Sequence, residues 1–330
     1  MWQKHGKGKG IQAYCCWIGK KQSVESRGKG RGGVSGFPKH GNDDSRAKFG
    51  TEKASVASSF EDLPEECISN IISLTSPRDA CVAALVSKTF KSAVDSDAMW
   101  EKFLPPDYAS LIPGSRVFSS KKELYFALCD HFLIEDGSKS FWLEKASGKK
   151  CIMLSALDLA VGYEEDASLI HSLEYWKWYP IPESRFERVG EIVTTFEIHG
   201  STYSSILSPE TLYSAYVVFK KLDHFRGFED CTIQAYILMG TFVSRRLVCF
   251  DPVTDENFEG YNGRLKPKQR EDEWMELELG EFFNEAGGDD EIIVTASQYK
   301  SNFRWIEGLV IEGIEIRPTE NQQSFFSLEG

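Results

Sequence analysis

The sequence has no Cys-x-x-Cys pair, no long apolar run and no apolar stretch at its N-terminus. Its eight cysteines are scattered at positions 15, 16, 67, 81, 129, 151, 231 and 249, which argues against a disulfide framework and a thiolate zinc site. No run approaches the roughly 18 to 20 apolar residues that a membrane span needs, and no signal peptide is predicted. These absences indicate a reducing compartment, so we expect the chain in the cytosol, the nucleus or both.

Positive charge is scarce outside the first 58 residues. The whole chain carries a net charge of −12, yet residues 1–58 hold twelve Lys or Arg and four acids. The rest of the chain is therefore strongly acidic and is a poor match for nucleic-acid phosphates. We expect no nucleic-acid partner for the body of the protein.

Catalytic motifs are also lacking. The six histidines stand far apart, without metal-ligand spacing or a nucleophile-elbow motif. The glycine-rich run 28–33 follows no predicted strand and precedes no predicted helix, so it is not a phosphate loop. Pairs of acids, which could hydrolyse glycosides, are expected by composition in a chain with 50 Asp and Glu. We predict a non-catalytic protein without cofactor or metal.

Residues 1–58 contain eleven of the 27 glycines and almost no hydrophobic periodicity. Such a composition predicts a disordered basic tail. Four interpretations remain open: a solvated segment without partner, an RNA-binding segment, a nuclear import signal, or a segment lying on an acidic membrane surface. The adjacent cysteines at 15 and 16 are candidates for acylation.

Residues 60–104 show a 3.6-residue period that predicts three short amphipathic helices. Ser76 and Pro77 begin the second helix as cap and first residue, and its apolar positions continue as far as Val94. The third helix carries Trp100 and ends before the two prolines at 105 and 106. So small a helical unit buries too little surface to stand alone.

This segment resembles an F-box, through Leu63-Pro64, Ile71-Ile72, Val86-Ser87-Lys88-x-Phe90 and Asp97-x-x-Trp100. The resemblance implies docking on a Skp-type adaptor, which joins the chain to a cullin ubiquitin ligase. For any single apolar residue of this segment, the alternative to docking is a role in packing the three helices together. The positions expected near the adaptor are Leu63, Pro64, Ile68, Leu85, Val86 and Trp100.

A further helix over residues 120–132 is predicted by a Ser120-x-x-Glu123 capping box. We assign it to the helical domain, at residues 59–135. The period then changes to two, and residues 138–320 are predicted to form a β-domain, followed by a tail over 321–330. A hairpin is expected around Ser147-Gly148. Further strands are predicted at 191–198, 213–220, 232–239, 246–250, 274–279, 291–296 and 303–316.

Two details of the strands are predicted as well. In 274–279 Met275, Leu277 and Leu279 alternate with Trp274, Glu276 and Glu278. This predicts one buried face and one face in water. Gly308 and Gly313 are expected to mark bulges or kinks. Because no repeated helical crossovers separate the strands, the fold class is α+β, with a small all-α domain followed by an all-β antiparallel sandwich.

The β-domain is similar to the plant phloem lectin family. The resemblance rests on the run from Phe141-Trp142 through Ser155-Ala156-Leu157-Asp158-Leu159, on Tyr175-Trp176-x-Trp178, and on the runs 213–220, 274–283 and 314–318. It implies a jelly-roll-like sandwich that binds glycans, with an F-box in front in one branch of the family. The residues that it implies for a sugar site are Tyr163, Trp176, Trp178 and Glu291.

Two departures bear on sugar binding. Tyr163 stands where the family pattern has a tryptophan, and the connection 164–174 is about six residues longer than usual and holds three acids at 164–166. Core packing is the alternative for Trp176 and Trp178, and a solvated turn is the alternative for Glu291. We therefore expect a ligase adaptor whose sandwich binds a glycoprotein or glycan target, or alternatively a protein surface.

Overall fold

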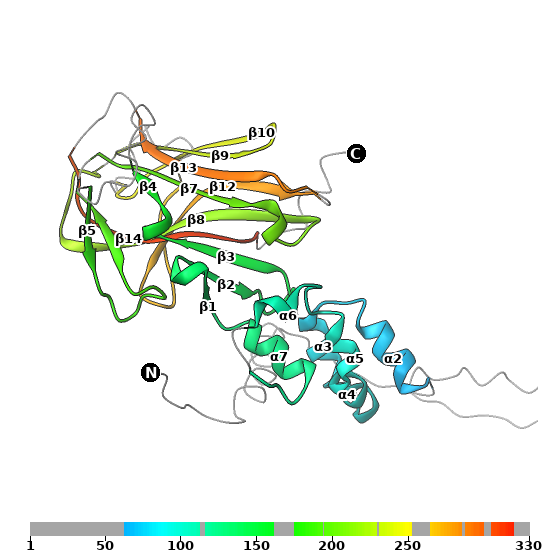
Figure 1. The fold of residues 1–330 in the computed structure, drawn as a ribbon. Helices are drawn as coiled ribbons and strands as arrows, with labels where there is room; N and C mark the ends of the chain where they lie inside the picture. The colour runs from blue at the N-terminus through cyan, green and yellow to red at the C-terminus, as the bar shows by residue number, and fades with distance from the viewer. Residues whose placement is uncertain are drawn as a thin grey trace, which may run out of the picture. The chain divides into compact units, whose positions relative to one another are not determined.

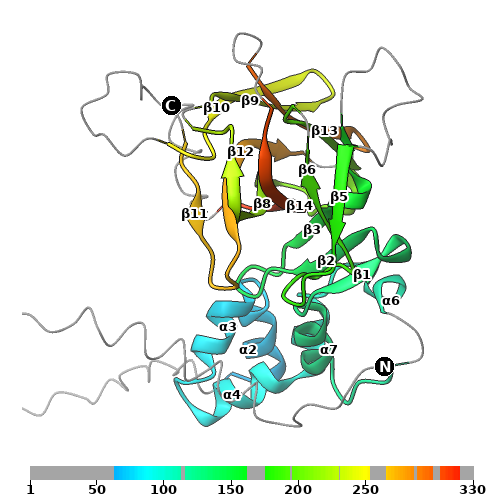
Figure 2. The ribbon, with the colours of Figure 1, turned by 90° about the vertical axis from the view of Figure 1, so that its left-hand side faces the viewer.

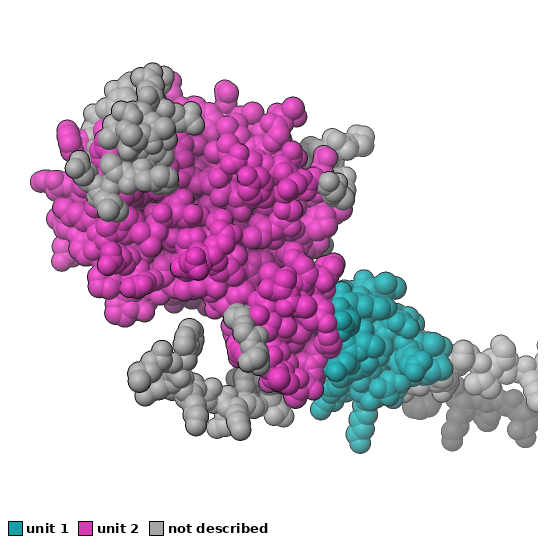
Figure 3. Space-filling view, viewed as in Figure 1, with its two compact units in different colours: residues 1–103 teal, residues 104–330 magenta. Residues whose placement is uncertain are grey.

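The computed structural model describes residues 63–112, 116–161, 175–193, 195–229, 231–252, 265–285, 288–299 and 305–319. The basic tail, the C-terminal tail and Tyr163 lie outside the described residues. The chain divides into two compact units, residues 1–103 (unit 1) and residues 104–330 (unit 2), coloured separately in Figure 3.

Unit 1 is helical. The prediction of the second helix is wrong in one respect, because the helix ends at Ala83 and does not continue to Val94. Ser87 has an extended backbone and its hydroxyl accepts a hydrogen bond from the Phe90 N–H at 3.3 Å, so a new helix begins there. Ser76 caps the preceding helix as expected, by accepting from the Asp79 N–H at 3.1 Å. The helices are α2 (Glu65–Ile72), α3 (Pro77–Ala83), α4 (Lys88–Asp95) and α5 (Asp97–Glu101).

Two buried hydrogen bonds join the helices of unit 1. The Ser69 hydroxyl on α2 donates to the Ala93 carbonyl on α4 at 2.8 Å. The Trp100 indole on α5 donates to the Val94 carbonyl at 2.6 Å. Both side chains thus satisfy their polar atoms inside the apolar interior.

Unit 2 begins with α6 (Tyr108–Leu111) and α7 (Lys121–Leu128). The boundary predicted near residue 135 therefore differs from that of the structure, which lies between residues 103 and 104. The reason is local packing: Tyr125 of α7 is fully buried, and its hydroxyl lies 3.3 Å from the Lys145 carbonyl in the first β-hairpin. Ser120 caps α7, because its hydroxyl accepts from the Glu123 N–H at 3.1 Å.

The larger sheet, here called sheet 1, has the strand order β1-β2-β3-β14-β8-β12-β11, and β6 pairs with both β14 and β5 (Figures 1 and 2). The β2–β3 hairpin is confirmed, with Gly148 at a positive φ of 74° in its turn. The strands are β1 (Phe132–Ile134), β2 (Lys139–Leu143), β3 (Lys150–Ser155), β5 (Trp176–Tyr179), β6 (Val189–Ile192), β8 (Thr211–Arg226), β11 (Lys268–Gln269), β12 (Met275–Asn284) and β14 (Glu307–Pro318).

The smaller sheet, sheet 2, has the order β10-β9-β13-β7-β4 and packs over sheet 1 (Figure 1). The main core lies between them and includes Leu154 and Val217 from sheet 1 and Ile237 and Ile292 from sheet 2, all fully buried. The predicted antiparallel sandwich is therefore confirmed. The strands are β4 (Ala160–Val161), β7 (Glu197–Tyr203), β9 (Ile233–Met239), β10 (Phe242–Val248) and β13 (Glu291–Gln298).

The single strand predicted over 191–198 is wrong. Residues up to Ile192 belong to β6 of sheet 1, and residues from Glu197 belong to β7 of sheet 2. The chain crosses here from one sheet to the other. Period-two alternation carries no information about which sheet a strand joins, so the crossing is invisible in the sequence.

The face of 274–279 predicted to meet water is partly covered. Trp274 is fully buried and joins Trp142, Phe186 and Val218 in a second apolar cluster, separate from the main core. The Lys220 ammonium lies 4.8 Å from the centre of the Trp274 ring. Sheet 1 is thus covered on both faces in this region.

The bulges expected on β14 are confirmed. Its register against β8 shifts between Glu307 and Leu309, around Gly308, and again between Ile311 and Gly313. Gly308 has a positive φ of 78°, which a residue without Cβ adopts at little cost.

Candidate functional site

The break between α3 and α4 exposes two large apolar side chains. Leu85 is 60% exposed and Val86 is 67% exposed. Their backbone N–H groups still bond to the carbonyls of Val82 and Ala83 at 3.0 Å, so the exposed turn has a defined geometry. Leu63 and Pro64, just before α2, are also exposed, as are Ile71 and Leu74. Solvent-exposed apolar side chains in so small a unit are typical of a docking surface.

Two residues of the predicted adaptor site do not reach the surface. Ile68 and Trp100 are fully buried. Trp100 is held by its hydrogen bond to Val94 and by an edge contact with Phe103, with ring centres 5.6 Å apart. In this structure the two residues hold the helices together, and of the predicted set only Leu63, Pro64, Leu85 and Val86 are exposed.

The aromatic pair of the predicted sugar site lies on β5. Trp176 and Trp178 project to the same side of the strand and stack, with ring centres 5.4 Å apart and planes 28° apart. Trp176 is only 8% exposed, and Trp178 packs against the same core. A Cβ on Gly190 of β6 would lie 2.2 Å from the Trp176 ring, so this ring rests directly on the neighbouring strand. The burial of Trp176 leaves no open ring face for a sugar.

The opposite side of β5 faces a buried carboxylate, Glu191 of β6. Glu191 accepts hydrogen bonds from the Tyr179 hydroxyl at 2.6 Å and from the Gly308 N–H at 2.9 Å. It also contacts His224 Nε2 at 3.0 Å and the Lys177 ammonium at 4.0 Å. Burial opposes ionisation, but these hydrogen bonds outweigh it and lower the pKa of Glu191. The carboxylate is thus occupied by donors of its own fold, which indicates a structural role.

Glu291, a further sugar-site candidate, lies in the other sheet from the tryptophans. Glu291 is exposed at the start of β13 in sheet 2, opposite Tyr203, whereas the tryptophans lie in sheet 1. No contact between Glu291 and either tryptophan occurs within the part of the chain that the structure describes. Tyr163 falls outside that part.

A group of charged side chains that the sequence interpretation missed covers part of sheet 1. Glu315 of β14 is 2% exposed and is contacted by Arg185 at 3.0 Å, Arg270 at 3.2 Å and Arg317 at 2.6 Å. Glu276 of β12 binds the last two of these arginines, at 2.9 and 2.8 Å. The alternation of Glu315 and Arg317 with Ile314 and Ile316 was the available signal, because charged residues on one strand face commonly pair across strands.

The three arginines determine the ionisation of Glu315. Burial alone would raise its pKa, but the guanidinium groups reverse this and hold the pKa at about 2. Conversely, Arg317 is desolvated, yet its carboxylate partners raise its pKa. The cluster is fully paired, so it stabilises the fold of unit 2 and offers no vacant charge to a ligand.

The described residues contain neither a membrane-spanning helix nor a metal-binding cluster. None of their helices combines the length and apolarity needed to cross a bilayer. No group of three or more His, Cys, Asp or Glu within residues 63–319, apart from the undescribed gaps, is placed to hold a metal ion.

Two family models match this chain: the F-box domain over residues 60–102 and Phloem protein 2 over residues 149–318. In Arabidopsis thaliana, F-box protein PP2-B10 is 55% identical over 272 residues, which cover 81% of this chain and 96% of that protein. F-box protein SKIP3 is 50% identical over 283 residues (83% and 94%), and F-box protein PP2-B5 is 44% identical over 316 residues (92% and 100%). With a helical F-box in front of an antiparallel sandwich, and relatives matched over nearly their whole length, the chain belongs to the F-box proteins of the phloem protein 2 family.

Proposed function

We propose that this protein is a substrate-recognition adaptor of a cullin-type ubiquitin ligase, in which unit 1 binds a Skp-type adaptor and unit 2 binds the target. The observation that carries the proposal is the exposure of Leu85 and Val86 at the α3–α4 break, within the segment that matches the F-box model. Burying one such side chain against a partner contributes about 1.5 to 3 kcal/mol. Two of them supply a large part of the binding energy that a stable complex needs.

The proposed role requires no bond-making step in this chain. An adaptor acts by holding the target close to the charged ubiquitin carrier, which raises the effective concentration of the reacting groups. We assign this role to the cytosol or the nucleus, where a ligase of this kind meets its targets. The acidic body of the chain supports a protein partner and not a nucleic acid.

The adaptor proposal predicts the effect of a double substitution. Leu85→Asp together with Val86→Asp places two charges where apolar contact is needed, and we expect about a 100-fold or greater loss of affinity for a purified Skp-type adaptor. Isothermal titration calorimetry with the full chain measures this loss. Val117→Asp is the matched control, because Val117 is 94% exposed and lies in unit 2. Equal affinity of the double variant and the control would contradict the proposal.

For unit 2 we propose recognition of a protein surface in place of a glycan. The support comes from the aromatic pair on β5: Trp176 is buried in the core, and Trp178 packs against it. A sugar needs an open aromatic face on which its apolar side can stack. A folded or extended protein segment does not need one and can bind elsewhere on the sandwich.

A glycan array tests this choice. We expect the intact chain to show no saturable binding to N-acetylglucosamine-containing glycans. Substitution of Trp176 would be a poor probe, because removing a buried tryptophan costs about 3 to 5 kcal/mol of stability. Glu291→Gln and Tyr163→Ala are better, since Glu291 is exposed. Saturable binding that either substitution abolishes would show instead that the sandwich is a lectin.

A further inference from the structure

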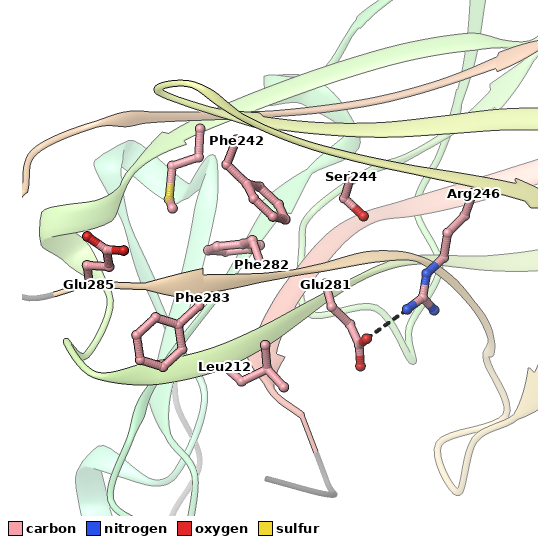
Figure 4. Close-up of a pocket in the computed structure, with 9 residues that line it drawn as sticks. Leu212, Phe242, Ser244, Arg246, Glu281, Phe282, Phe283 and Glu285 are labelled. Carbon is pink, nitrogen blue, oxygen red and sulfur yellow. Dashed lines mark hydrogen bonds and ion pairs between the residues drawn. The ribbon is translucent and has the colours of Figure 1, made fainter. Parts of the chain in front are cut away.

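A groove of about 330 Å³ opens on unit 2 between the β9–β10 hairpin and β12 (Figure 4). Figure 4 shows Phe242, Phe282 and Phe283 gathered at one end, and Leu212 and Met239 also line the groove. Ser244, Arg246 and Glu281 line the other end, and Glu285 lies near the aromatic rings. The groove thus combines an apolar end with a polar one along a single strand, β10.

Strand β10 is one of the two edge strands of sheet 2. Met239 and Phe242 face each other across the two-residue turn at Gly240 and Thr241, so they form the hydrogen-bonded pair that closes the hairpin. The alternate residues Val243, Arg245 and Leu247 therefore direct their backbone N–H and C=O groups away from β9. The Leu247 carbonyl accepts from the Leu265 N–H at 3.3 Å, as this geometry requires.

The same geometry leaves the backbone of Val243 and Arg245 at the sheet edge. Within the described residues no strand pairs with this part of β10. An edge of this kind is a template for an added strand. The side chains of such a strand that point inward would enter the groove beside Phe242 and Ser244.

The charges at the groove favour a basic occupant. Arg246 is paired with Glu278 and with Glu281, the latter at 2.7 Å. Glu285 is exposed near the apolar end. Two carboxylates, Glu281 and Glu285, and one guanidinium, Arg246, thus line the groove, and the surplus negative charge complements a Lys or Arg side chain.

We propose that β10 binds an extended peptide segment of a target protein as an added strand, with an aromatic or aliphatic side chain in the apolar end of the groove and a Lys or Arg two residues away. The inference rests on the proposed adaptor function and names the element of the target that this adaptor recognises. Such an element is an exposed basic segment with a large apolar residue at its centre. Backbone pairing supplies affinity, and the groove supplies selectivity.

The test uses the full chain and a fluorescein-labelled peptide, Gly-Ser-Lys-Ser-Phe-Ser-Lys-Ser-Gly, followed by fluorescence anisotropy. Val243→Pro removes an edge N–H that the β9 ladder does not use, so the hairpin remains while the added strand loses a donor. We expect about a 5- to 10-fold weaker affinity, as for the loss of one hydrogen bond. Val243→Thr keeps the N–H and is expected to bind within about twofold of the wild type.

A charge exchange tests selectivity. Glu285→Lys is expected to weaken binding of the lysine peptide and to strengthen binding of the same peptide with both lysines replaced by glutamate. A peptide methylated on its backbone nitrogens is expected not to bind. Together these results would show strand addition at this edge.

Several outcomes would overturn the inference. They are absence of saturable binding to the wild type, equal binding by Val243→Pro and Val243→Thr, and displacement of the peptide by an N-acetylglucosamine trimer. Binding only by a chain shortened to end at Thr319 would also overturn it, because the groove would then belong to the chain's own C-terminal segment. Affinity for the Skp-type adaptor, measured on the same preparations, reports separately on the adaptor function.

Discussion

Replacement of Glu315 by alanine is expected to destabilise unit 2 by about 3 to 5 kcal/mol. The carboxylate is 2% exposed and forms ion pairs with three arginines, Arg185, Arg270 and Arg317. Without it, Arg270 and Arg317 keep Glu276, and Arg270 also keeps Asp272. Arg185 loses its ion pair with Glu315, so part of the desolvation of these cations is no longer offset. The urea midpoint of the β-sheet circular dichroism signal measures the loss.

The same carboxylate predicts the direction of the pH dependence. Its pKa is lowered to about 2 in the folded state, from the ordinary 4.5, so the folded state holds the ionised form more strongly than the unfolded chain does. The resulting stability is fully present above pH 4.5 and is lost as the pH falls from 4.5 towards 2. Glu315→Gln removes this titration, so we expect a shallower acid limb in its stability profile.

A second ion pair on the same strand is the control for Glu315. Glu307 pairs with Arg226 at 2.8 Å, but its side chain is 41% exposed. Glu307→Ala is therefore expected to cost about 0 to 1 kcal/mol. If Glu315→Ala were no more destabilising than Glu307→Ala, the Glu315 cluster would not be a stabilising element of unit 2.

Replacement of Gly313 by alanine is the second change with a large expected effect. A Cβ at this position would lie 1.9 Å from the Leu154 carbonyl oxygen and 2.9 Å from its carbon. The obstacle is the backbone of β3, which pairs with β14 at this point, so no side-chain rotation can relieve the clash. We expect a loss of about 3 kcal/mol or more in the free energy of unfolding, or no folded protein at all.

Gly240 provides the comparison for Gly313. It lies in the β9–β10 turn with φ +55°, and the nearest atom to an added Cβ is Asp290 Oδ1 at 3.5 Å. Asparagine tolerates this backbone conformation, so Gly240→Asn is expected to cost less than about 1 kcal/mol. Thermal unfolding of both variants, followed by circular dichroism, separates the two effects. A Gly313→Ala protein as stable as the wild type would contradict the close approach of β3 and β14.

The candidate sites show which of their features the order of residue types predicts and which it does not. Leu85 and Val86 belong to a recognisable order of residues, so they could be proposed as docking positions from the sequence. The turn that exposes them was not predicted, because the helical period continues through it. Trp176 and Trp178 stand two residues apart, so on a strand they point to the same side, and they stack there. Whether that side faces water or the core depends on Gly190 and β6, which lie at a distance along the chain.

The groove and the Glu315 cluster were missed for a related reason. Phe242 and Phe283 line the groove from different sheets, and they meet only because β10 lies beside β12. Glu315 meets Arg185 and Arg270 across segments that are separated by many residues. Period-two alternation places each side chain on one of two faces, but it does not say which strands are neighbours.

By itself the amino-acid sequence determined the helical segment followed by a β-rich body, the caps at Ser76 and Ser120, and the glycine bulges on β14, because each depends on a few adjacent residues. The tertiary structure alone decided the crossing of the chain between sheets after Ile192 and before Glu197, the burial of Trp176 and, among the described residues, the unpaired edge of β10 beside an acidic groove. Each of these depends on which strands pair, and pairing is determined by the free energy of burying the whole core.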